Sequence, residues 1–377
     1  MKGRAVLTKL AILVATAALS ALAAGGSLAT ASRSAMAPEN LRLHKALDAL
    51  VAAGVPGAAL LLRQGGRTIR LTSGYDNLKP RTPIRADDRF RVGSITKTFV
   101  ATVVLQLVGE RKLALDDTVE RWLPGVVPNG KRITVRQLLN HTSGLFSYTN
   151  DREFLAKANR DPLRVWTPRQ LVAIATAHKP HFAPGAGWSH ADTNYVVLGL
   201  IVEKASGNSV GAELRRRILA PLRLRATSIP TAPRVAGRYA HGYYLRPLED
   251  VSVGSPSVAW AAGALVSNAD DLAVFFRALL RGRLLRPGLL RAMETTVESG
   301  AGAGHGLGLA ARRVPCGTVW GFSGGVPGYG TTAVSSKDGR RQVVLLLNAT
   351  SRAAPSYDSP RPVARAEERV LLTAICG

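Results

Sequence analysis

A serine and a lysine three residues apart could form the centre of an acyl-transfer site. Ser94 and Lys97 lie at the start of a segment whose apolar residues recur with helical spacing, namely Val100, Val103, Val104, Leu107 and Val108. The hydroxyl is therefore expected at the N-terminus of a buried helix, with the lysine one turn further on the same face. Desolvation lowers the pKa of such a lysine, so it could accept the serine proton. A nucleophile, a base and free backbone donors are what covalent acyl transfer requires.

The same pair could be a helix-capping serine and a surface lysine, but Ser-x-x-Lys occurs only once in the chain. Its flanks and three later segments favour the catalytic interpretation. These segments are residues 90–97 (FRVGSITK), 138–145 (LLNHTSGL), 184–189 (PGAGWS) and 324–330 (GGVPGYG). In this order they resemble the class C β-lactamase and secreted D-alanyl-D-alanine carboxypeptidase superfamily, over a stretch from about Leu43 to the C-terminus.

The resemblance implies a covalent mechanism. Ser94 would attack the acyl carbon with Lys97 as base, and the N–H groups of Ser94 and Gly325 would hold the oxyanion. Ser323 and Gly324 match the third motif of the family and are expected to contact the substrate. No metal and no organic cofactor are implied.

Two of the three family motifs are altered at important positions. His190 stands where the family has a tyrosine, and a histidine there could carry protons. Asp192 stands at an asparagine position and is expected either to contact substrate or to cap the helix that follows. Phe322 replaces a histidine or lysine, and a phenylalanine cannot bind a substrate carboxylate. The alternative is that His190 is a packing residue in an inactive site.

Other patterns in the chain do not favour further sites. Gly-x-Ser-x-Gly occurs at residues 207–211 and 321–325, but neither copy has the strand–turn–helix context of a hydrolase elbow. His178 and His181 are separated by Pro180, which breaks the helix that would align them as metal ligands. His141 is expected to be a structural histidine that holds a loop.

Alternating apolar runs at the two ends of the chain predict two β-hairpins. The first pairs residues 58–63 with 68–73, and the second pairs residues 329–336 with 341–348. Helices are predicted near both termini and throughout the middle of the chain. Hairpins produce antiparallel strands, and the terminal helices would cover one face of the resulting sheet.

The family resemblance places these strands in one sheet. It implies an α/β (α+β) architecture of the β-lactamase/DD-peptidase type, an antiparallel sheet with an inserted helical region. The expected sheet domain is discontinuous, comprising residues 38–90 and 235–377. The expected helical domain, residues 91–234, carries the Ser-x-x-Lys helix.

Residues 1–37 have the composition of a secretory signal peptide. A basic start precedes an uncharged apolar run over residues 10–24, which is short for a membrane span, and Ala-x-Ala sites end at Ala31 and Ala37. The protein is therefore expected to be secreted without a lasting membrane anchor. In an oxidising compartment Cys316 and Cys376 are expected to form a disulfide, with two buried free thiols as the alternative.

The formal net charge of +25 favours anionic partners, and for an exported protein these would be cell-wall polymers. No nucleic-acid-binding module is recognisable. The sequence predicts an exported serine acyl hydrolase or transferase, with a D-alanyl-D-alanine carboxypeptidase acting on peptidoglycan stem peptides as its closest functional model. One alternative is an esterase or amide-forming transacylase whose substrate lacks a free carboxylate. Another is a degenerate protein that binds wall peptide or β-lactam without turnover.

Overall fold

The computed structural model describes residues 38–300, 302–351 and 360–377. The predicted signal peptide, residues 1–37, lies outside the described residues. Within the described ranges, no helix combines the length and the apolar character that a membrane span requires.

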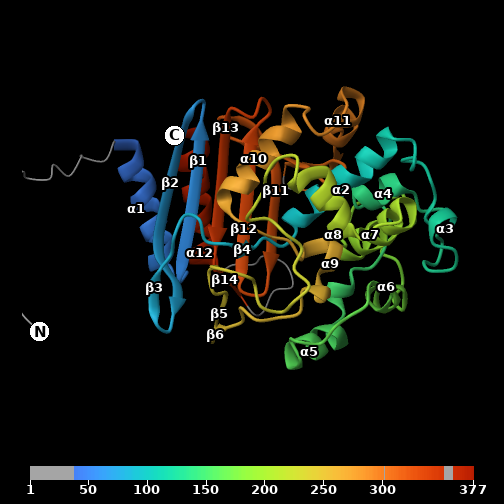
Figure 1. Cartoon of the computed structure of the whole chain (residues 1–377), viewed down its shortest axis with the longest axis horizontal. Helices are drawn as coiled ribbons and strands as arrows, with labels where there is room; N and C mark the ends of the chain where they lie inside the picture. Colours follow the sequence, from blue (N-terminus) through green and yellow to red (C-terminus); the bar gives the residue numbers. More distant parts are fainter. Residues whose placement is uncertain (1–37, 301, 352–359) are drawn as a thin grey trace, which may run out of the picture. The chain divides into compact units, whose positions relative to one another are not determined.

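A large antiparallel sheet forms the centre of the described chain and confirms the predicted fold class (Figure 1). Its nine strands follow the order β3-β2-β1-β13-β12-β11-β10-β9-β8. Both predicted hairpins lie in its centre, and their strands pair side by side through β1 and β13. The strands span Gly57–Gln64 (β1), Arg67–Leu78 (β2), Arg81–Pro83 (β3), Val297–Glu298 (β8), Ala303–His305 (β9), Ala310–Val314 (β10), Gly317–Val326 (β11), Tyr329–Ser336 (β12) and Arg341–Leu347 (β13).

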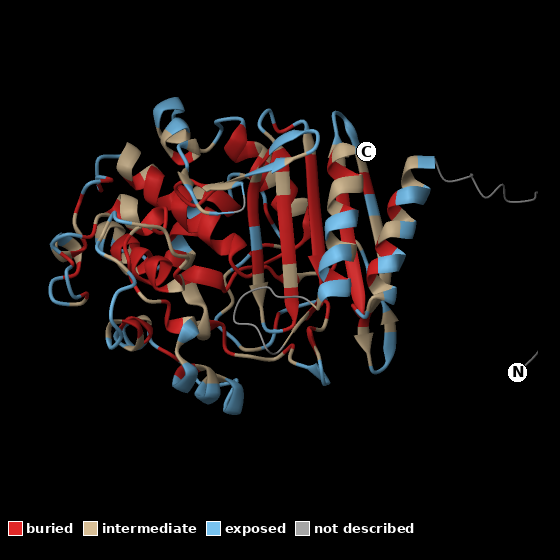
Figure 2. Cartoon of the chain, turned by 180° about the vertical axis from the view of Figure 1, so that it is seen from behind, coloured by how far each residue is buried: buried red, intermediate tan, exposed pale blue. Residues whose placement is uncertain are grey.

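Strand β1 is apolar on both faces because both faces of the sheet are covered. Leu60 and Leu62 belong to a core with the two terminal helices, α1 (Pro38–Ala52) and α12 (Arg361–Cys376). Leu61 points the other way, into the main core beneath α10 (Ala269–Leu280). Figure 2 shows the two terminal helices lying side by side on one face of the sheet, as predicted.

A disulfide ties this layer together. Cys316, in the turn between β10 and β11, is bonded to Cys376 at the end of α12, with the two Cα atoms 5.4 Å apart. The bridge therefore fastens the end of the last helix to the turn between β10 and β11.

Helices pack beside the other half of the sheet. They are α2 (Ile95–Gly109), α3 (Val119–Trp122), α4 (Val135–Leu139), α5 (Arg152–Arg160), α6 (Pro168–Thr176), α7 (Asp192–Ser206), α8 (Val210–Leu214), α9 (Trp260–Gly263) and α11 (Pro287–Glu294). Two small sheets join this part, β4 (Phe90–Arg91) with β7 (Val266–Ser267), and β5 (Tyr243–Leu245) with β6 (Leu248–Asp250) and β14 (Ala349–Thr350). The division into a helical domain and a discontinuous sheet domain remains a prediction, and α9, α10 and α11 follow residue 234.

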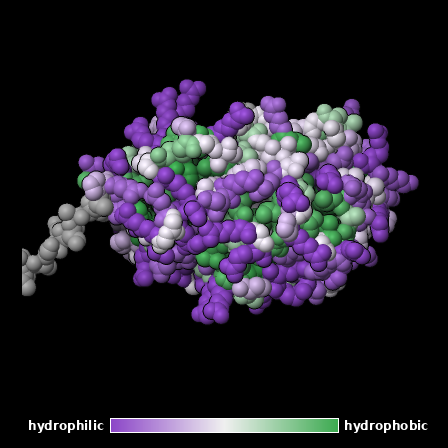
Figure 3. All heavy atoms as spheres, turned by 90° about the horizontal axis from the view of Figure 1, so that it is seen from above, coloured by the Kyte–Doolittle hydropathy of each residue, from purple (hydrophilic) through white to green (hydrophobic). Residues whose placement is uncertain are grey.

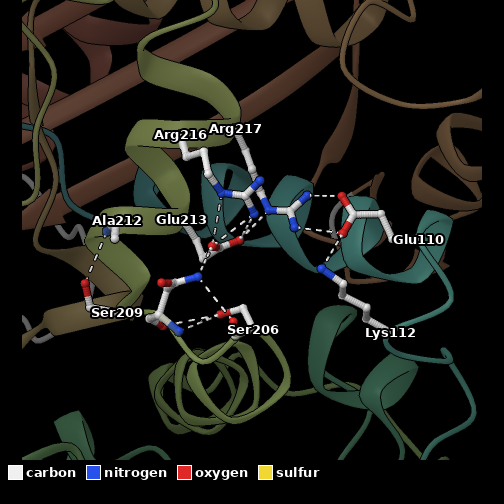
Figure 4. A network of polar contacts seen from close by, with 9 residues as sticks. Glu110, Lys112, Ser206, Ser209, Ala212, Glu213, Arg216 and Arg217 are labelled. Carbon is white, nitrogen blue, oxygen red and sulfur yellow. Dashed lines mark hydrogen bonds and ion pairs between the residues drawn. The ribbon is translucent and has the colours of Figure 1, made fainter.

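The central helix of this part is α2, which is buried on nearly all sides. Its C-terminal end is held by an ion-pair network with the π-helical segment Arg215–Leu219 (Figure 4). Arg217, only 5 % exposed, donates to both Glu110 and Glu213. The Arg217 guanidinium outweighs the burial of Glu110 and holds its pKa at about 2. The network therefore fixes the helix that carries the Ser-x-x-Lys motif.

Candidate active site

Ser94 lies where the chain enters α2, as the sequence predicts. It occupies the N-cap position without capping the helix through its side chain. The preceding residue, Gly93, has a φ of +53°, and a Cβ atom there would lie 2.5 Å from the Gly325 nitrogen. Only glycine fits this tight turn, because it lets the chain before Ser94 press against β11.

Lys97 is fully buried and its ammonium group has three oxygen partners. Nζ donates to Ser94 Oγ at 2.7 Å, to Asp192 Oδ1 at 2.6 Å and to the Ala262 carbonyl oxygen at 2.9 Å. Burial lowers the pKa of Lys97, although the Asp192 carboxylate opposes this change. The predicted pairing of Ser94 with Lys97 is thus present in the structure, with the lysine nitrogen in hydrogen-bond reach of the hydroxyl.

Asp192 forms a buried ion pair with Lys97. It is the first residue of α7, whose N-cap is Ala191, so the alternative prediction of an N-capping Asp192 is wrong. Its second carboxylate oxygen accepts from Thr149 Oγ1 at 2.8 Å. Burial raises the pKa of Asp192, but the charges of Lys97 and His190 and the hydrogen bonds from Lys97 and Thr149 together lower it by more, to about 2, so the carboxylate is ionised. These contacts hold Lys97 in place, and a direct contact of Asp192 with substrate stays a prediction.

Strand β11 brings the third motif to the serine. A Cβ atom on Gly324 would lie 2.9 Å from the Ser94 nitrogen, so a glycine is required at this contact as well. The N–H groups of Ser94 and Gly325, predicted to form the oxyanion hole, therefore lie in the same narrow region. Phe322 is on the same strand face as Gly324, 8 % exposed, with its ring edge-on to His305 and the centroids 5.4 Å apart.

Ser323 points to the opposite face of the sheet. Its hydroxyl lies 3.4 Å from Thr332 Oγ1, which in turn donates to Glu367 of α12. Successive residues of a strand face opposite sides of the sheet. Because Gly324 faces Ser94, the side chain of Ser323 points away from it. The structure does not bring the Ser323 hydroxyl to the serine–lysine pair.

Comparisons with known proteins agree with this geometry. The family model described as "Beta-lactamase" matches residues 43–367. The chain belongs to the beta-lactamase family.

Individual relatives in the beta-lactamase family include amide hydrolases. The crystal structure of a D-stereospecific amidohydrolase from Streptomyces sp. is 42 % identical, with a TM-score of 0.82, covering 90 % of this chain and 99 % of that one. The D-amino acid amidase from Ochrobactrum anthropi SV3 is 29 % identical, with a TM-score of 0.78, covering 89 % and 98 %. A penicillin-binding protein of Bacillus subtilis (strain 168) is 28 % identical over 85 % of this chain and 77 % of its own length. The chain is thus a serine hydrolase of the beta-lactamase fold.

Within this beta-lactamase-family site, His190 is partly buried and neutral. Burial lowers the pKa of His190 to about 4, with Asp192 raising it and Lys97 lowering it by smaller amounts. Among the described residues, no hydrogen bond joins its ring to Ser94 or Lys97. The role of His190 as proton carrier therefore stays a prediction.

Sequence reasoning missed a cluster of three histidines beside the serine–lysine pair. The ring of His141 lies 4.7 Å from that of His190 and 4.8 Å from that of His305, centroid to centroid. His141 Nδ1 accepts from the Ala191 N–H at 3.1 Å, which anchors the turn before α7 and agrees with a structural role. His305 comes from a glycine-rich stretch without periodicity, so only the packing of β9 against its neighbours reveals it.

Proposed function

We propose that this chain is an exported serine amidohydrolase that cleaves an amide bond through a Ser94 acyl-enzyme. Its substrate would be the amide of a D-amino acid or a short peptide without a free carboxylate beside the scissile bond. The similarity to a D-stereospecific amidohydrolase and to a D-amino acid amidase supports this substrate class.

The observation that carries the proposal is the position of Phe322. The side chain is buried against His305 on the strand face that reaches Ser94. The family resemblance places a cation at this position, where it would bind a substrate carboxylate. A buried phenyl ring instead penalises a charged group that approaches it, because a carboxylate would lose its hydration without a partner.

The proposed chemistry uses the chain's own groups. Ser94 Oγ attacks the amide carbon while its proton moves to the neutral form of Lys97, 2.7 Å away. The Ser94 and Gly325 N–H groups stabilise the oxyanion. The leaving amine departs with that proton, passed from Lys97 directly or through neutral His190. Water then attacks the ester, returns a proton to Ser94 Oγ and releases the carboxylic acid.

A D-alanyl-D-alanine carboxypeptidase is the second candidate. The similarity to a penicillin-binding protein over most of the chain favours it. Under this candidate the substrate would be a peptidoglycan stem peptide, and a β-lactam would acylate Ser94.

Export is part of the proposal. The composition of residues 1–37 supports it, and so does the disulfide between Cys316 and Cys376, because such bridges persist in oxidising compartments.

Four substrates assayed side by side test the proposed function. They are D-phenylalanine amide, a diacyl-Lys-D-Ala-D-Ala peptide, nitrocefin and a p-nitrophenyl ester, each with wild type and Ser94→Ala. We expect kcat/KM to be highest for the D-amino acid amide among the peptide and amide substrates, with no turnover by Ser94→Ala. Faster release of D-alanine from the carboxylate-bearing peptide would contradict the proposal. Turnover of none of the four, with labelling of Ser94 intact, would favour a binding protein.

A further inference from the structure

A groove lined by arginines lies away from the serine–lysine pair, between α10 and the sheet. It is a cavity of about 350 Å³, and its lining includes Arg63, Arg277, Arg281 and Arg283 together with the apolar Val274 and Ala278. We call these four arginines and the cavity between them the arginine groove. The face of the molecule seen from above is largely hydrophilic, with smaller hydrophobic areas between the polar side chains (Figure 3).

Neutral oxygen acceptors hold two of the four guanidinium groups of the groove, those of Arg63 and Arg281. Arg63 donates to Thr68 Oγ1 and to Gln342 Oε1, and Gln342 is itself fixed by the Ala273 carbonyl oxygen of α10. Arg281 Nε donates to the Asp338 carbonyl oxygen at 3.1 Å. The groove is therefore preorganised, with N–H groups still available.

The carboxylates nearest the groove already have cationic or polar partners. Asp270 pairs with Arg70, which lies outside the cavity lining, through both of its oxygens. The Asp338 carboxylate accepts from Ser336 Oγ and pairs with Arg340. Among the described residues, no carboxylate lies within ion-pair distance of Arg63, Arg277 or Arg283. Burial and, next, the charge of Arg277 lower the pKa of Arg63, while the Asp270 carboxylate raises it by a smaller amount.

The cavity beside the α2 network provides a contrast. It is about 340 Å³ and is also lined by arginines, but Arg217 there is committed to Glu110 and Glu213. That network is a structural ion-pair cluster (Figure 4). The arginine groove has the same kind of cation without the acidic partners.

We propose that the arginine groove binds an oxyanion ligand that carries at least two linked phosphate groups. A guanidinium offers paired N–H donors that match two oxygens of one phosphate, and several guanidiniums around one concavity match several such groups. Like charges in a concave site also focus the field and attract polyvalent anions. The apolar floor formed by Val274 and Ala278 offers no competing acceptor.

The test uses the full chain with inorganic tripolyphosphate and orthophosphate as probes, measured by isothermal titration calorimetry at low and high salt. The groove variant is Arg277→Gln/Arg283→Gln. The matched control is Arg132→Gln/Arg160→Gln, which removes the same charge from two exposed arginines outside the groove. Ester hydrolysis at Ser94 reports correct folding of every variant.

We expect wild type to bind tripolyphosphate more tightly than orthophosphate, and more weakly at high salt. The groove variant should lose roughly tenfold or more in affinity, since each charge-assisted hydrogen bond is worth about one decade. The control should stay within about threefold of wild type. Arg283→Glu, a single exposed change, must show the same loss if the double variant does not fold.

Three results would overturn the proposal. The first is no binding of tripolyphosphate by wild type. The second is equal losses in the groove and control variants, which would show an effect of net charge alone. The third is equal affinity for orthophosphate and tripolyphosphate, which would show that linked phosphates are not recognised.

Discussion

The buried pair of Lys97 and Asp192 allows a quantitative prediction for Asp192→Asn. The substitution keeps an oxygen acceptor near Lys97 Nζ but removes the negative charge 2.6 Å from it. Coulomb's law at this distance, with an effective dielectric constant of about 20, gives an attraction of roughly 6 kcal/mol. The amide dipole and local relaxation offset part of this attraction, so the net loss is on the order of 2 kcal/mol.

The direction of the change follows from the charge of each form. Asp192 favours the ammonium form of Lys97, so its neutralisation lowers the pKa of the lysine further below the ordinary value. Because Lys97 must be neutral to accept the Ser94 proton, the acid limb of kcat/KM should move to lower pH. Activity on the acid side of the wild-type limb should rise accordingly.

The assay is the pH profile of ester hydrolysis from pH 4 to 10 for wild type, Asp192→Asn and Thr149→Val. The Thr149 variant removes the other hydrogen bond to the carboxylate, 2.8 Å long, while leaving the charge. It should therefore move the limb much less than Asp192→Asn does. An acid limb that stays in place or moves to higher pH in Asp192→Asn would refute the assignment of Lys97 as the base.

The free energy of unfolding provides an independent test of the Lys97–Asp192 ion pair. The pKa of Asp192 is lowered in the folded state, so the pair stabilises the fold above the unfolded pKa of aspartate, about 4, and this contribution is lost as the pH falls further. Asp192→Ala leaves Lys97 buried without a countercharge and should cost about 3–5 kcal/mol at pH 7. Urea unfolding at pH 7 would measure this loss, and Asp192→Asn should lose less.

Three further predictions concern His190, Phe322 and the disulfide. If the His190 ring carries protons, His190→Ala should lower kcat/KM by roughly 10²–10⁴. In the wild-type pH profile of kcat/KM, the acid limb due to His190 should then lie near its pKa of about 4. An unchanged kcat/KM in His190→Ala would mean that the residue has only a packing role. Phe322→His should raise kcat/KM for the diacyl-Lys-D-Ala-D-Ala peptide relative to D-phenylalanine amide, as measured by D-alanine release, whereas an unchanged ratio would show that Phe322 does not exclude carboxylates. The disulfide closes a loop of 60 residues, so Cys316→Ser/Cys376→Ser should lower the free energy of unfolding by roughly 4 kcal/mol in the chain-entropy model; equal stability of both proteins in urea would contradict this.

The parts predicted correctly from the sequence depend on local patterns. The two hairpins and the helix that begins after Ser94 follow from apolar residues that recur with periods of two and 3.6 residues. These periods are visible in the local sequence. The Ser94–Lys97 contact follows from helix geometry alone. The placement of all strands in one sheet needed the family resemblance, because periodicity does not say which strands pair.

The parts that were missed depend on contacts between distant segments. Asp192 is adjacent to a helix start, which made capping plausible, but the buried ammonium of Lys97 attracts its carboxylate more strongly than the helix N–H groups do. Ser323 was matched to a motif without the strand register that turns it away from the site. His305 has no local signal, and only the packing of β9 places it near His141.

The central claim is that Ser94 is the nucleophile, and covalent labelling tests it most directly. A fluorophosphonate or fluorescent penicillin would be incubated with wild type and with Ser94→Ala, followed by tryptic peptide mapping by mass spectrometry. We expect one adduct, on the peptide that contains Ser94, and none on Ser94→Ala, because Lys97 Nζ, 2.7 Å from the Ser94 hydroxyl, is placed to accept its proton. An adduct on Ser323 or Ser209, or equal labelling of the alanine variant, would contradict the mechanism.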